Sequence, residues 1–96
     1  MYESKGIVIL SSDIYNVDAY RAEHNELFKS IQKWAMMAGY YGLVLFEPVE
    51  DHQFACAYKF SCETEGFCRG LAAELQSKLR REFPNMKVVV EQVKQP

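Results

Sequence analysis

The 96-residue chain lacks any excess of positive charge, because it carries 11 Lys and Arg residues against 13 Asp and Glu residues, a formal net charge of −2. Proteins that bind nucleic acid usually present a basic face to the phosphate backbone. The chain also has few proline and glycine residues, 3 and 5 respectively, and shows no internal repeat or low-complexity linker. We therefore expect a globular protein that does not bind nucleic acid.

Cysteines are few as well: Cys56, Cys62 and Cys68. An odd number cannot all pair within one chain, and no basic start followed by an apolar run indicates a signal peptide. The longest apolar stretch, near residues 40–46, is much shorter than the ~20 residues that span a membrane. These absences predict one domain over residues 1–96 with no membrane association, located in the reducing environment of the cytoplasm.

The spacing of apolar residues predicts the element order β-α-β-β-α-β. Strands are expected at residues 6–11, 40–46, 52–60 and 86–93, with helices at about 18–38 and 65–83 and a frayed start of four or five residues. With right-handed crossovers this order closes into a ferredoxin-like α+β sandwich, in which two helices cover one face of a four-stranded antiparallel sheet. The second and fourth strands then lie at the edges, where Pro48 is tolerated although it lacks an N–H group.

The third expected strand, HQFACAYKF at residues 52–60, alternates large and small side chains. Successive side chains of a strand point to opposite faces of the sheet. Because lysine avoids burial more strongly than alanine seeks exposure, we expect Lys59, Ala55 and Ala57 to face away from the helices. The bulkier row is then expected beneath the helices: Phe54, Cys56, Tyr58 and Phe60.

An aromatic row on a strand of this fold can instead stack nucleic-acid bases, as in the RNA-recognition motif. That motif places a basic residue and a glycine before alternating aromatics on the open face of the sheet. Here Gln53 precedes Phe54, and Cys56 occupies the second stacking position. Packing in the core is therefore the favoured interpretation of the aromatic row.

The helix-free face is predicted to have an apolar centre and charged margins, a pattern typical of contact surfaces. The same parity argument turns Glu47 outward on the second strand, and Lys87, Glu91 and Val93 outward on the fourth. The candidate partner-binding residues on this face are Tyr41, Leu43, Leu45, Ala57, Lys59 and Val89. We expect the partner to be another protein or a second copy of the chain.

No set of residues with a recognisable catalytic, metal-binding or cofactor-binding pattern is found, so none is assigned. Structural zinc sites normally use close cysteine pairs, whereas the three cysteines here are separated by five residues each. Cys62 and Cys68 are near enough in sequence to approach one another, but small buried thiols are the favoured interpretation. His52 shares a strand face with Cys56 but lies beyond hydrogen-bond reach of it.

Two glycines, Gly66 and Gly70, fall within the second expected helix, where each costs roughly 1 kcal/mol. Close packing of that helix against the sheet or the first helix is the favoured explanation. A smooth groove for a partner is the alternative.

The sequence therefore predicts a small non-catalytic protein-binding module, such as a regulator, adaptor or inhibitor of a larger protein. It would act through the helix-free face and self-associate, and its size is common among virus-encoded modulators. The alternative is a dimeric α+β barrel, in which two such sheets enclose a small molecule. That alternative has only His52, Tyr41 and Lys59 as polar groups near the cavity.

Overall fold

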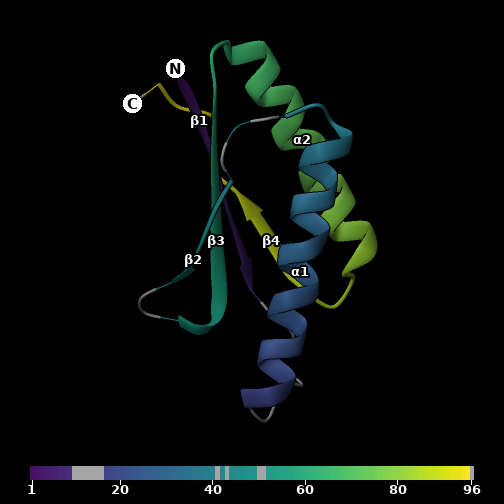
Figure 1. Cartoon of the computed structure of the whole chain (residues 1–96). Coiled ribbons are helices and arrows are strands. Elements are labelled where there is room, and N and C mark those ends of the chain that lie inside the picture. Colours follow the sequence, from purple (N-terminus) through teal and green to yellow (C-terminus); the bar gives the residue numbers. More distant parts are fainter. Residues whose placement is uncertain (10–16, 41, 43, 50–51, 96) are drawn as a thin grey trace.

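The computed structural model of the chain describes residues 1–9, 17–40, 42, 44–49 and 52–95 (Figure 1). Its elements follow in the order β1 (Tyr2–Ile9), α1 (Val17–Met37), β2 (Leu45–Val49), β3 (His52–Cys62), α2 (Glu65–Glu82) and β4 (Lys87–Val90). The strands pair antiparallel in the order β2-β3-β1-β4. The expected α+β class, with four strands and two helices, is confirmed. The arrangement is compatible with a ferredoxin-like sandwich.

Three expected boundaries are wrong. The first residues are not frayed, because β1 begins at Tyr2 and pairs with β3 as far as Cys62, while Glu3 exchanges backbone hydrogen bonds with Lys94. The second strand does not start at Tyr40 but at Leu45, and it runs through Pro48 to Val49 with a register shift. The hairpin tip expected at residues 50–51 lies outside the described residues. Strand β4 stops at Val90, three residues short of the expected end.

Helix α1 ends in a Schellman motif. Gly39 adopts a left-handed conformation with φ of 73°, which glycine adopts without a Cβ penalty. Its N–H donates to the carbonyl of Met36 at 3.2 Å, and the N–H of Tyr40 donates to the carbonyl of Ala35 at 2.9 Å. The reversal brings the Tyr40 ring against Phe60, with ring centroids 5.6 Å apart.

Helix α2 begins after Thr64, as the sequence predicts. The Thr64 hydroxyl accepts a hydrogen bond from the N–H of Phe67 at 3.3 Å, and Arg80 and Arg81 lie in the last turn. The close packing expected at Gly66 and Gly70 is wrong, since both residues are exposed and a Cβ at either would meet nothing within 4 Å. The apolar stripe that does face the sheet instead consists of Cys68, Leu71, Ala72, Leu75 and Leu79.

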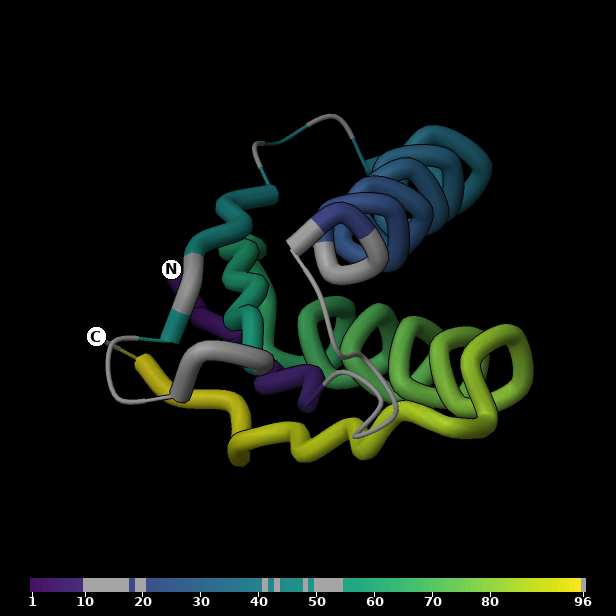
Figure 2. Tube along the Cα trace, turned by 90° about the horizontal axis from the view of Figure 1, so that it is seen from below, coloured from purple at the N-terminus to yellow at the C-terminus, as the bar shows by residue number. Residues whose placement is uncertain are grey.

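Both helices lie on the same side of the sheet (Figure 2). The core forms between them, where the side chains of Cys56, Tyr58 and Phe60 are fully or almost fully buried. The predicted parity of β3 is thus confirmed for these three residues. Phe54, the fourth residue of the predicted buried row, has a side chain outside the described part of the structure. Tyr58 and Phe60 cannot be a surface for stacking bases.

Candidate functional site

The sheet face away from the helices, here called the open face, is organised in rows by the strand register. Ala57 of β3 lies opposite Ile7 of β1, which in turn lies opposite Val89 of β4. Glu47 of β2 closes this row on the other side. Because the neighbouring residue on each strand points into the core, the row presents three apolar side chains with one carboxylate at the margin.

The six predicted partner-binding residues are only partly brought together on this face. Leu45 and Val89 are 44% and 42% exposed, and Lys59 is half-buried. Ala57 has the expected orientation but is only 5% exposed, because its side chain ends at Cβ between larger neighbours on both flanking strands. Tyr41 and Leu43 lie outside the described residues.

A second lysine of the open face was missed by the sequence reasoning. Lys5 of β1 lies directly opposite Lys59 of β3, and the Lys59 ammonium lies 4.0 Å from the carboxylate of Glu3. Like charges directly opposite one another destabilise a sheet. An acidic group or water beside Lys5 and Lys59 would reduce this repulsion. The missed signal is the alternation of Lys5, Ile7 and Ile9 with Gly6 and Val8, which sets the phase of β1.

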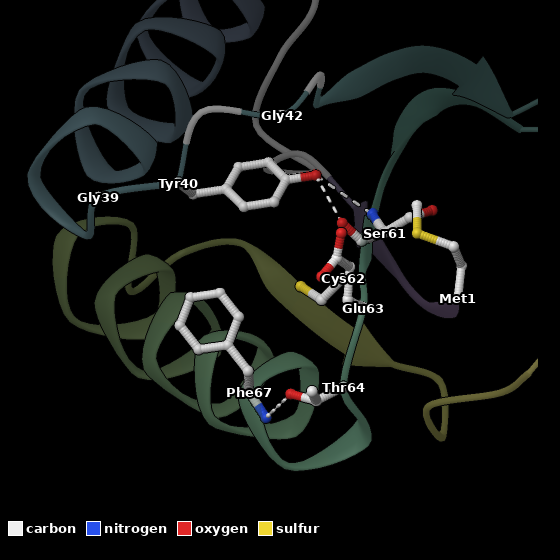
Figure 3. Close-up of a pocket in the computed structure, with 9 residues that line it drawn as sticks. All are labelled: Met1, Gly39, Tyr40, Gly42, Ser61, Cys62, Glu63, Thr64 and Phe67. Atoms are coloured by element: carbon white, nitrogen blue, oxygen red, sulfur yellow. Dashed lines mark hydrogen bonds between the residues drawn. The ribbon is translucent and has the colours of Figure 1, made fainter.

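A second feature is a cleft of about 530 Å³ between the end of α1 and the start of α2, here called the end cleft (Figure 3). It is lined by Met1, Gly39, Tyr40, Gly42, Ser61, Cys62, Glu63, Thr64 and Phe67. Phe67 is 52% exposed.

Tyr40 holds one wall of the end cleft in place. Its hydroxyl donates to the carbonyl of Ser61 at 2.9 Å and accepts from the N–H of the same residue at 3.3 Å. A Cβ at Gly42 would overlap the Tyr40 ring, so a larger residue there would displace the ring. Burial raises the pKa of the Tyr40 phenol, with smaller contributions from the thiols of Cys62 and Cys68, and the Ser61 hydrogen bond opposes the rise.

Two thiols meet beneath the end cleft. Cys62 and Cys68 are buried and reduced, and both lie next to Tyr2: Cys62 is opposite Tyr2 in the strand register, and the Cys68 thiol contacts the Tyr2 carbonyl oxygen at 3.7 Å. Burial raises the pKa of Cys62 to about 11, and the neighbouring Cys68 thiol adds to the rise. The Cys62 thiol is therefore protonated at neutral pH.

Within the described part of the chain, no three His, Cys, Asp or Glu side chains are grouped so that they could hold a metal ion. The side chain of His52 lies outside that part. Neither α1 nor α2 combines the length and apolar character that crossing a membrane requires.

Comparison of the chain with protein-family models, with curated proteins and with solved structures gives no match. The geometry of the open face and of the end cleft is therefore the basis for assigning a function.

Proposed function

We propose that the protein is a small non-catalytic binding module built on a ferredoxin-like sandwich, and that its open face binds a second copy of the chain. The observation that carries this proposal is the partial exposure of Leu45 and Val89. They lie on either side of the apolar pair Ile7 and Ala57, and charged residues border this group. Apolar surface that water still reaches gains free energy when a partner covers it.

Association through the face is also favoured over association through the strand edges. Edge strands with free backbone groups pair readily with other chains. On the β4 edge, Arg80 Nη2 donates to the carbonyl of Val88 at 3.2 Å. On the β2 edge, Pro48 has no N–H group to offer. Both edges are thus poor templates for a further strand.

One symmetric arrangement of two copies pairs charges of opposite sign along β4. A two-fold axis that crosses the strands at the row of Ile7 and Val89 leaves β4 facing β4 of the partner but reverses its direction. Lys87 lies two residues before Val89 and Glu91 lies two residues after it, so Lys87 of one copy then faces Glu91 of the other. Each copy contributes both charges, so the contact forms twice.

Sedimentation velocity over a series of protein concentrations tests this proposal. We expect a reversible dimer whose dissociation constant rises by at least about tenfold in Val89→Lys, because an ammonium would be buried without a partner. Met36→Lys is the matched control, since Met36 is 78% exposed on α1, and it should leave the dissociation constant unchanged.

A charge exchange tests the symmetric arrangement. Lys87→Glu should weaken the dimer by placing two carboxylates opposite one another, and adding Glu91→Lys should restore it. A chain that stays monomeric at every accessible concentration would contradict self-association. Equal weakening by Val89→Lys and Met36→Lys would contradict the open face as the interface.

The dimeric barrel that binds a small molecule is the second candidate, and the pairing of Lys5 with Lys59 favours it. Two lysines directly opposite one another on the open face would suit an anionic ligand. Titration calorimetry with small carboxylates and phosphates separates the two functions, because Lys5→Met should abolish anion binding but leave a simple protein interface intact. A cytoplasmic location stays a prediction from the cysteine number.

A further inference from the structure

We propose that Cys62 and Cys68 are an oxidation site, at which a small hydroperoxide entering the end cleft converts the two thiols into an intramolecular disulfide. This inference concerns the end of the sheet next to α2. It does not depend on self-association through the open face.

The thiols meet because the chain reverses at the start of α2. Cys62 is the last residue of β3, two positions before the N-cap Thr64, and Cys68 lies in the first turns of α2. The N–H of Cys68 donates to the carbonyl of Thr64 at 3.1 Å, which closes the first turn and carries the Cys68 side chain back toward Cys62. Both thiols therefore lie against the same residue of β1, because Cys62 is opposite Tyr2 in the strand register and Cys68 Sγ contacts the Tyr2 carbonyl oxygen at 3.7 Å.

The two sulfur atoms differ in accessibility, and this difference sets their roles. Cys62 lines the end cleft (Figure 3) and keeps 5% of its surface exposed. Cys68 has no exposed surface, and its Sγ contacts the carbonyl oxygen of Tyr2 at 3.7 Å. A small oxidant therefore reaches Cys62 first, and Cys68 is the thiol that resolves the product.

The chemistry balances with a hydroperoxide as the two-electron oxidant. The Cys62 sulfur attacks the distal peroxide oxygen and becomes a sulfenic acid, and the O–O bond breaks to release water or an alcohol. The Cys68 sulfur then attacks the sulfenic sulfur, the S–O bond breaks, and a second water leaves with the Cys68 proton. The protein loses two electrons and two protons. The Cys68 side chain gives up its contact with Tyr2 as the sulfurs close to a bond of about 2.05 Å.

The reaction is slow at neutral pH, because the thiolate is the reactive species and burial keeps the Cys62 thiol protonated. The rate should rise about tenfold per pH unit between about pH 7 and pH 10, below the raised pKa of Cys62. For a solvent-exposed cysteine, the oxidation rate would stop rising at a lower pH.

Cys56 is the internal control for specificity. It is fully buried in the middle of β3, opposite Val8 and Pro48. Six residues of extended strand separate it from Cys62, a distance of roughly 20 Å. No disulfide between these two is possible in the folded chain.

Peptide mapping of the unaltered full-length protein tests the proposal without a substitution. After hydrogen peroxide treatment under native conditions and alkylation of the remaining thiols, trypsin cuts after Lys59 and Arg69. Peptide 60–69 then contains both Cys62 and Cys68, whereas Cys56 falls in peptide 34–59. We expect peptide 60–69 to lose the mass of two hydrogen atoms, to escape alkylation and to regain both thiols on reduction, while peptide 34–59 is alkylated normally.

Two variants then separate the roles of the thiols. In Cys68→Ala we expect Cys62 to gain oxygen atoms instead of forming a disulfide, and in Cys62→Ala we expect Cys68 to stay reduced. A disulfide that joins peptide 34–59 to peptide 60–69, or one that joins two chains, would overturn the proposal. So would a native protein in which both thiols stay reduced at about pH 9 until it unfolds.

Discussion

At the residue scale, the contact between Tyr58 and Gly6 determines how β1 and β3 support the core. The two residues are directly opposite in the register, and the Tyr58 ring lies over Gly6 where any other side chain would project. The ring also lies nearly parallel to that of Phe60, with centroids 6.5 Å apart. The missing side chain of one strand thus makes room for the large side chain of its neighbour.

Gly6→Ala should lower the free energy of unfolding by about 1–3 kcal/mol, because the added methyl group would overlap the Tyr58 ring and force it to move. Urea denaturation of the two proteins measures the difference. Gly66→Ala is the control, since a Cβ at that exposed position meets nothing. An equal or higher stability of Gly6→Ala would show that the ring does not rest on Gly6.

Tyr58→Phe should stabilise the protein by about 1 kcal/mol or leave it unchanged. The Tyr58 hydroxyl is one of three buried polar groups that have no hydrogen-bond partner among the described residues, and removing an unpaired buried group removes its desolvation cost. Thermal unfolding of the variant and the parent checks the sign. A loss well above 1 kcal/mol would indicate that the hydroxyl is bonded, for example to an internal water molecule.

At the element scale, the ends of the helices follow local rules, and glycine has opposite roles in the two helices. In α1 it ends the helix, because Gly39 adopts a left-handed conformation. In α2, Gly70 occupies an exposed position where a Cβ meets nothing. The same substitution should therefore have opposite effects in the two helices.

Gly70→Ala should raise the free energy of unfolding by about 0.5–1 kcal/mol, because alanine loses less backbone entropy when a helix forms. Gly39→Ala should lower it by about 1–2 kcal/mol, since an L-residue is strained at a φ of 73°. Chemical denaturation of both variants and the parent under the same conditions measures the two changes in the free energy of unfolding. A destabilising Gly70→Ala would indicate that another chain or segment packs closely there.

At the scale of the whole molecule, two buried side chains that can lose a proton make the free energy of unfolding depend on pH in the alkaline range. Burial raises the pKa of Tyr58 to about 12, with the charge of Arg80 opposing the rise, and burial also raises the pKa of Cys62 to about 11. The unfolded chain ionises these groups near their ordinary values of 10.0 and 9.0. Between the two sets of values, the folded protein holds more protons than the unfolded chain.

These two groups should therefore cause no change in the free energy of unfolding below about pH 8. They should lower it as the pH rises from 9 toward 12. The free energy of unfolding should decrease by up to about 1.4 kcal/mol per pH unit for each group that is protonated only in the folded state. Urea unfolding midpoints at a series of alkaline pH values measure it. In Tyr58→Phe the slope above about pH 10 should decrease, and an unchanged slope would contradict the assignment to Tyr58.

Much of the fold could be predicted from local patterns. The alternation in HQFACAYKF predicted the buried side of β3, because a strand has only two faces and lysine resists burial. The N-cap at Thr64 and the stop at Gly39 were predicted because capping depends on a few consecutive residues. The start of β2 was missed, because Tyr40 makes its hydrogen bonds with Ser61, a residue far along the chain.

The sequence by itself determined which residues are suited to strands, helices and caps, because these preferences act over a few neighbouring positions. Only the tertiary structure decided which of those residues meet. The strand register placed Lys5 beside Lys59 and sank Ala57 between its neighbours. The turn into α2 placed Cys68 against Tyr2, the residue opposite Cys62 in the strand register. Such contacts depend on how separate elements are aligned in space, and a one-dimensional pattern does not contain that alignment.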